Sequence, residues 1–161
     1  MEKYIQSFID VSKNVFKELI GIEIEADRPY FSRHSSYPNW DISGVIGITG
    51  EACGAVVISM KKKLALKLTE ILTKRKHGEV DDEVVDSIGE IINIIAGNIK
   101  LDFEKEFKLV ISLPTVVRGD AHTLQWPHTD ARIICIPFKI FKDDVFFLAI
   151  AIESADSGEN A

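Results

Sequence analysis

The chain has little cysteine, no excess of positive charge and no long uninterrupted apolar run, and these absences exclude several classes of protein. It carries 19 lysines and arginines against 25 aspartates and glutamates, for a formal charge of −6. That balance opposes non-specific binding to nucleic acid. No segment reaches the roughly 20 apolar residues of a membrane-spanning helix, and charges interrupt residues 1–16 too often for a signal peptide. We therefore expect a cytoplasmic protein that binds neither nucleic acid nor membrane.

The two cysteines also lack a functional pattern. Cys53 and Cys135 lie in separate strand-like stretches, without the paired spacing of zinc or redox motifs. We expect both to be buried, inert thiols. The sequence likewise has no nucleophile-elbow serine and no glycine-rich phosphate loop, so neither covalent catalysis nor nucleotide hydrolysis is indicated.

The length of 161 residues and the apolar fraction of 46% predict one domain with a single core. We place this domain at 1–153 and expect 154–161 to be a disordered tail. Apolar spacing predicts helices and strands along the rest of the chain. The predicted helices cover 2–20, 61–76 and 81–106, the predicted single strands 22–26 and 108–114, the predicted hairpins 41–60 and 132–153, and a loop 31–39.

The order of these elements suggests an internal repeat. A helix, a strand and a hairpin occur twice, with one additional helix between the two series. The corresponding segments share no residue identities, so the repeat is a hypothesis from pattern alone. It predicts an α+β fold in which two helix-plus-three-strand units form an approximately six-stranded sheet, with long helices packed on one face.

The helix predicted at 81–106 has a polar stripe opposite its isoleucine-rich face. On a helical wheel, Asp86, Glu90, Asn93 and Gly97 fall within about 60° of one another. Any amphipathic helix needs a solvated side, so such a stripe can lack a chemical role. However, asparagine is unfavourable inside a helix and glycine costs about 1 kcal/mol relative to alanine. This cost favours a function for the stripe.

These residue types suit the hydrolysis of an acylphosphate. A carboxylate accepts a hydrogen bond from a lysine, and an amide three residues later can both donate to and accept from a water molecule. Hydrolysis of a phospho-aspartate requires mainly that a water be placed in line with the phosphorus, because a metal bound beside the phosphate can neutralise its charge.

The stripe also resembles a known family. The spacing Asp86-x3-Glu90-x2-Asn93, with Pro114 about twenty residues downstream, is similar to the signature of the CheC/CheX/FliY phosphatases of bacterial chemotaxis. The segment SIGEIINIIAGNIK, residues 87–100, most resembles the CheX-like members. The sequence-specific likeness is confined to Ser87–Asn98 and Pro114, whereas length and element order agree over nearly the whole chain.

The resemblance implies a phosphatase that removes phosphate from the phospho-aspartate of a CheY-like response regulator receiver domain. It implies that Glu90 contacts a lysine of the receiver active site and that Asn93 directs the attacking water. Asp86, Gly97 and Pro114 would support the site or the docking of the partner. No cofactor of its own is implied, because the Mg²⁺ would belong to the receiver.

CheC-like members usually carry the signature on two helices, whereas CheX-like members carry it once and are typically homodimers. At the matching distances before Pro29 this chain has Ile5 and Phe8. The resemblance therefore implies a single site and a homodimer. The alternative is a non-catalytic signalling or flagellar interaction module of the same fold, which would dock a receiver domain through the same helix face.

One further polar loop is a weaker candidate. His122, His128 and Asp130, with Asp120 as another oxygen donor, could ligate a metal, but their spacing matches no familiar motif, and we assign no metal site. The dipeptide Trp126-Pro127 in this loop could anchor a partner or cover the edge of the core.

Overall fold

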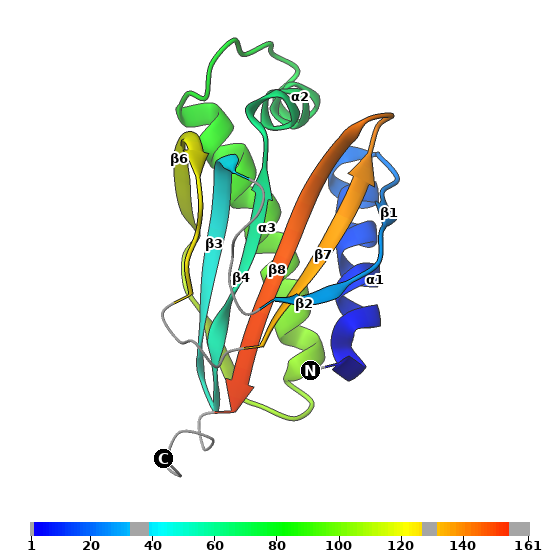
Figure 1. Cartoon of the computed structure of the whole chain (residues 1–161), viewed down its shortest axis with the longest axis vertical. Coiled ribbons are helices and arrows are strands. Elements are labelled where there is room, and N and C mark those ends of the chain that lie inside the picture. The colour runs from blue at the N-terminus through cyan, green and yellow to red at the C-terminus, as the bar shows by residue number, and fades with distance from the viewer. Residues whose placement is uncertain (1, 33–38, 127–131, 155–161) are drawn as a thin grey trace.

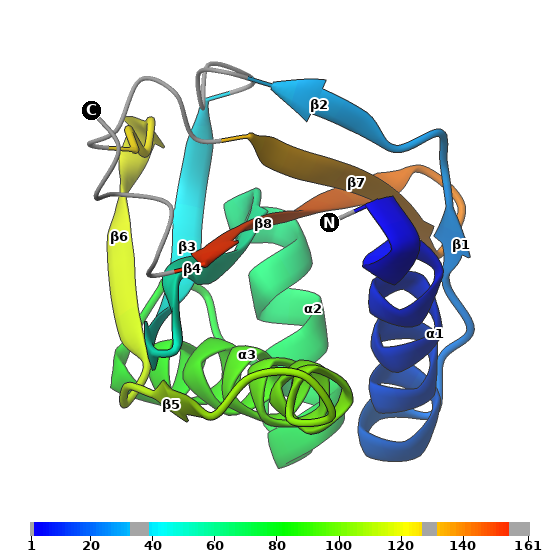
Figure 2. The ribbon, with the colours of Figure 1, turned by 90° about the horizontal axis from the view of Figure 1, so that it is seen from below.

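The computed structural model describes residues 2–32, 39–126 and 132–154, and shows one antiparallel sheet with helices on one face (Figures 1 and 2). The predicted α+β class is confirmed. The disordered tail was predicted to begin at Ser154, but strand β8 includes that residue. The remainder of the predicted tail, 155–161, lies outside the described residues.

The three predicted helices are present, and local sequence sets their ends. The first comprises a 3-10 turn Glu2–Tyr4, α1 Ile5–Val15 and a π-helical turn Phe16–Ile20. It ends at Gly21, whose φ of 77° provides a left-handed cap. The remaining two are α2 Lys62–Thr73 and α3 Asp82–Phe103.

Eight strands form the sheet within the described residues. They are β1 Glu25–Ala26, β2 Tyr30–Ser32, β3 Trp40–Gly50, β4 Ala52–Met60, β5 Leu109–Ile111, β6 Thr115–His122, β7 Ile133–Ile140 and β8 Asp144–Ser154. Across the sheet the order is β1-β7-β8-β4-β3-β5, while β2 also pairs with β7 and β6 also pairs with β3. The eight strands thus occupy the six positions that the sequence predicted, because each edge position is shared by two shorter strands.

The pairing follows the two predicted units. Strands β1 and β2 of the first unit pair with β7 of the second, and β5 and β6 of the second pair with β3 of the first. The hairpins β3–β4 and β7–β8 meet where β4 pairs with β8. Each unit therefore supplies the edge of the other, and one core is shared between them.

The edge strands differ from their predicted bounds. The predicted strand 22–26 pairs only over Glu25–Ala26, and the chain pairs again over Tyr30–Ser32, within a stretch that was predicted partly as loop. The strand predicted at 108–114 ends at Ile111, ahead of Pro114, which has no N–H to donate. These short segments form strands because they pair with β7 and β3. Such pairing with a distant strand cannot be predicted from the sequence of the segment itself.

The core lies between the sheet and the helices. The predicted buried face of α3 is confirmed, because Ile88, Ile91, Ile92 and Ile95 are fully buried. At Gly44 of β3 the helix comes so close that a Cβ would lie 2.9 Å from Cγ2 of Ile92. Close contact with β3 therefore fixes which side of α3 faces outward.

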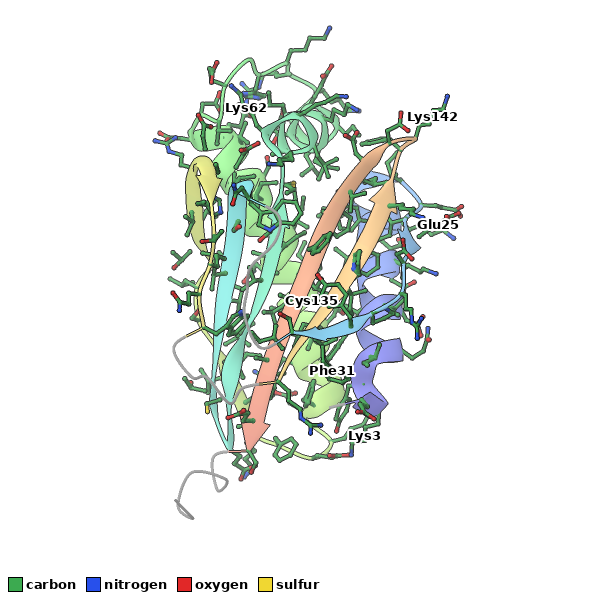
Figure 3. All side chains as sticks on the ribbon, in the orientation of Figure 1. Lys3, Glu25, Phe31, Lys62, Cys135 and Lys142 are labelled. Atoms are coloured by element: carbon green, nitrogen blue, oxygen red, sulfur yellow. The ribbon has the colours of Figure 1, made fainter. Side chains whose placement is uncertain are left out.

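The two cysteines differ in exposure. Cys135 of β7 is buried opposite Tyr30 of β2, and its burial raises the pKa of the thiol (Figure 3). The prediction that Cys53 is buried was wrong. Its side chain lies on the helix-free side of β4, one residue after the buried Ala52, near the exposed turn at Glu51. Among the described residues, no helix combines the length and apolarity needed to cross a membrane.

Candidate functional site

The helix that carries the polar stripe begins at a well-defined N-cap. The carboxylate of Asp81 accepts a hydrogen bond from the backbone N–H of Val84 at 3.0 Å, and Nδ1 of His77 lies 2.6 Å from the other oxygen. The hydrogen bond from His77, followed by that from Val84, lowers the pKa of Asp81 below its ordinary value. This cap fixes the first turn of α3 and hence the start of the stripe.

The stripe lies on the side of α3 opposite the buried isoleucines that face the sheet. Asp86, Glu90 and Asn93 are exposed, and Gly97 is half-buried. With a rise of about 1.5 Å per residue, the four positions extend about 16 Å along the helix. The prediction that these residues share one accessible face is therefore confirmed.

The polar side chains of α3 divide into two groups by their partners. The other charged and amide side chains of the helix are all engaged: Asp82 with Arg118 at 3.9 Å, Glu83 with Arg75, Asn98 with the carbonyl of Ile94 at 2.8 Å, Lys100 with Glu104 at 3.1 Å, and Asp102 with Ser7. In contrast, Asp86, Glu90 and Asn93 have no hydrogen-bond or ion-pair partner among the described residues. This carboxylate and amide group is free to bind molecules from outside the chain.

Pro114 lies beside the stripe. Its Cγ is 3.7 Å from the position that a Cβ on Gly89 would occupy, and Cγ2 of Val116 is 3.6 Å from the same point. Gly89 directly precedes Glu90 on α3. The fold therefore brings Pro114 next to the helical turn that holds Glu90, although twenty-four residues separate the two in sequence.

Gly97 has a different environment from Gly89. Among the described residues, no atom lies within 4 Å of the position that its Cβ would take, apart from its own helical backbone and chain neighbours. Packing within the chain therefore does not require glycine at this position. The surface above Gly97 is open for a partner to approach the helix backbone closely.

A groove that the sequence did not predict runs beside the stripe, between α1 and α3. Its volume is about 350 Å³, and Ile94 and Asn98 of α3 form one wall. The opposite wall consists of residues of α1 and the following π-helical turn: Val11, Asn14, Val15, Glu18 and Leu19. The spacing of Val11, Val15 and Leu19 indicates one helical face in the sequence, but only the fold shows that this face lies next to α3.

The matching positions of the first helix carry no second polar site. Phe8 is fully buried and stacks on Phe103 of α3, and Ile5 is partly buried. This part of α1 supports the core. Only α3 carries the signature within the described residues.

The second candidate region does not form a metal site in the described part of the chain. Nε2 of His122 lies 2.8 Å from the Ser43 hydroxyl, and Nδ1 lies 2.8 Å from the carbonyl of Gly119. His128 and Asp130 fall outside the described residues, and the rest contain no group of three or more potential histidine, cysteine or carboxylate ligands.

The tryptophan of that region packs against the sheet. Trp126 contacts a small cluster of Ile133, Cys135 and Ala151 on the helix-free face. This favours a covering role for the tryptophan over the alternative of an exposed anchor. Its neighbour Pro127 is outside the described residues.

Comparisons with known proteins show which proteins this chain is similar to. Residues 42–139, which include α3 and Pro114, match the family model described as chemotaxis phosphatase CheX. A curated relative, the CheY-P phosphatase CheX of Thermotoga maritima, is 26% identical over 154 residues, which cover 94% of this chain and 97% of the relative.

Solved structures are similar over almost the same length. A CheC-like superfamily protein from Shewanella sp. PV-4 has a TM-score of 0.84 at 27% identity, covering 94% of this chain and 97% of that one. The chemotaxis protein CheX from Vibrio vulnificus has a TM-score of 0.83 at 27% identity, covering 94% and 99%.

Proposed function

The chain belongs to the family of the chemotaxis phosphatase CheX, and from this premise we propose that it hydrolyses the phospho-aspartate of a CheY-like receiver domain. The observation that carries the proposal is the set of unpartnered side chains on α3. Asp86, Glu90 and Asn93 lack partners among the described residues, on a helix whose other charged and amide groups are all engaged.

In the proposed mechanism, Glu90 orients the receiver. Its exposed carboxylate accepts a hydrogen bond from the ammonium group of the lysine in the receiver active site. Such a charge-assisted bond is directional, so it fixes the receiver active site relative to α3. Glu90 thereby acts in both docking and alignment.

Asn93 places the water. Its amide donates one hydrogen bond and accepts another, so it can hold a water molecule in one orientation. The water oxygen attacks phosphorus as the bond between phosphorus and the aspartate oxygen breaks, which releases the carboxylate and inorganic phosphate, with the water proton passing to the phosphate or solvent. No covalent intermediate with this chain and no strong base are required.

The helical spacing suits these two tasks. Side chains three residues apart on a helix have Cβ atoms about 5–6 Å from each other. Glu90 and Asn93 can therefore contact a lysine and a water on two sides of one phosphoryl group. In the proposal the Mg²⁺ belongs to the receiver, where it neutralises phosphate charge, and this chain contributes no cofactor.

The remaining predicted residues frame this pair. Asp86 extends the polar stripe one turn toward the start of α3, Gly97 leaves the next turn open, and Pro114 packs beside Gly89. In the proposal they shape the surface on which the receiver docks and take no part in the chemical step.

The proposal also includes a homodimer in the cytoplasm. Strand β6 pairs with β3 on one side, and no described strand pairs with its other side. A second copy could add its own strand there about a two-fold axis. Sedimentation that shows a monomer at all concentrations would remove this part of the proposal.

The test is the decay rate of a phosphorylated CheY-like receiver from the same organism, with and without the chain. We expect the chain to accelerate decay and the Asn93→Ala variant to lose that acceleration. Binding of the phosphorylated receiver without faster decay would instead support the non-catalytic interaction module, with the stripe serving only as a docking surface.

A further inference from the structure

One leucine beside the stripe is almost fully exposed. Leu113 lies in the connection between β5 and β6, directly before Pro114, and 86% of its surface is accessible. Leaving so much apolar surface in water has a free-energy cost that a partner could remove by covering it.

The backbone around Leu113 is held on both sides. The N–H of Ser112 donates to the carbonyl of Gly47 and the hydroxyl of Ser112 accepts from the N–H of Gly47, both at 2.9 Å. The same hydroxyl donates to the carbonyl of Leu113 at 2.9 Å. On the other side Pro114 packs against Gly89 of α3. The leucine is therefore presented by a fixed backbone, which reduces the entropy lost when a partner binds.

A second exposed leucine continues the stripe itself. Leu101 lies four residues after Gly97 on the same face of α3, and 61% of its surface is accessible. It is about 12 Å along the helix from Asn93. An interface of ordinary size, about 800 Å² on each partner, would reach this far from a centre at Asn93.

We propose that Leu113 and Leu101 are the apolar anchors of the receiver interface, on either side of Glu90 and Asn93. This inference rests on the proposed function, because a receiver whose phosphoryl group meets Asn93 must lie over the adjoining surface. The occupant is therefore the receiver itself. Glu90 and Asn93 provide alignment, and the two leucines provide much of the affinity.

The chain offers a matched control in the same short segment. Val110 of β5 is 63% exposed. Its neighbours Leu109 and Ile111 face the core, so Val110 lies on the opposite, helix-free side of the sheet. Val110→Ser removes similar apolar surface only three residues from Leu113, but outside the proposed interface.

The experiment measures the binding of a CheY-like receiver, activated with beryllofluoride and Mg²⁺, to the full-length chain and its variants. We expect Leu113→Ser and Leu101→Ser each to raise the Kd about 10- to 100-fold, as expected for an exposed leucine that becomes buried on binding. The half-saturating concentration in the decay assay should rise by a similar factor. Val110→Ser should bind like the unmodified chain, and circular dichroism should show the same fold for all three.

The outcomes separate this proposal from the proposed function. If a leucine variant binds as tightly as the unmodified chain, that leucine is not an anchor. If Val110→Ser weakens binding as much as Leu113→Ser, the anchors are not specific and the proposal is overturned. If the unmodified chain binds the receiver but does not accelerate its decay, the proposed phosphatase activity is wrong, whereas the proposed role of the two leucines in binding is still supported. If the unmodified chain binds no CheY-like receiver of the organism, both the proposed function and the proposed interface are wrong.

Discussion

Pro114 packs against Gly89 at ordinary van der Waals distance, with its Cγ 3.7 Å from the position that a Cβ on Gly89 would occupy. A methyl group would therefore fit between the connection to β6 and α3. The situation at Gly44 of β3 is different, because a Cβ there would lie 2.9 Å from Cγ2 of Ile92 and 3.3 Å from Cγ2 of Ile58. Of these two glycines, Gly89 on α3 and Gly44 on the facing strand, only Gly44 is required by packing.

Two alanine substitutions test this difference. Gly89→Ala should raise the free energy of unfolding by up to about 1 kcal/mol, because alanine is the better helix former and its methyl has room. Gly44→Ala should lower it by about 1–3 kcal/mol, because the core between β3 and α3 is overpacked. Urea unfolding of both variants measures these changes. A loss of stability in Gly89→Ala would show that the contact with Pro114 is too tight for a methyl.

Glu90 and Asn93 should respond differently to truncation. Asn93→Ala should reduce the acceleration of receiver decay about 10²- to 10³-fold, the usual effect of losing one preorganised polar group, while the Tm stays near that of the unmodified chain. Glu90→Ala should affect both the half-saturating concentration and the maximal decay rate, because the carboxylate docks and aligns the receiver.

The control for both is Asp82→Ala. Asp82 is a fully exposed carboxylate in the first turn of the same helix, about 16 Å along the helix from Asn93, and it has an ion pair with Arg118 at 3.9 Å. This variant should accelerate decay as the unmodified chain does. An equal loss of activity in Asp82→Ala and Asn93→Ala would point to a general charge or folding effect instead of a site.

The sequence predicted the helix and its stripe because both depend on local periodicity. The spacing of Ile88, Ile91, Ile92 and Ile95 determines the buried side of α3, and the stripe follows as its opposite. Periodicity alone therefore places three polar side chains on one accessible face. Their lack of partners is not a local property, because it depends on which distant segments come near α3.

The features that the sequence missed depend on contacts between distant segments. Strand β2 pairs with β7 about a hundred residues later, and the groove beside Ile94 needs α1 to pack next to α3. The exposure of Cys53 depends on which side of the sheet the helices cover. Apolar spacing predicts which residues are buried in a segment, but it does not predict what lies beside that segment.

The N-cap of α3 predicts a pH dependence of stability. The hydrogen bond from His77 and that from the N–H of Val84 lower the pKa of Asp81 in the folded chain. A lowered carboxylate pKa gives stability that is present above the ordinary pKa of 3.8 and is lost as the pH falls through the folded value. Asp81→Asn keeps a capping oxygen but cannot ionise.

We therefore expect the unmodified chain to have a higher Tm than Asp81→Asn at pH 5, and the difference to shrink between about pH 5 and pH 2. Thermal unfolding followed by circular dichroism at several pH values measures this difference. A constant difference across that range would show that the charge of Asp81 contributes nothing and that only its capping oxygen matters.

Gly97 provides the most direct test of whether the stripe serves docking. Because no atom of the described residues beyond its own helical turn lies within 4 Å of the position of its missing Cβ, Gly97→Ala introduces no clash with them and should stabilise α3 by about 1 kcal/mol. If a receiver approaches the backbone there, the same methyl should weaken binding of the beryllofluoride-activated receiver. Greater stability together with weaker binding would identify a glycine retained for a partner at the expense of the fold. Greater stability with unchanged affinity would remove Gly97 from the site and leave Glu90 and Asn93 as its core.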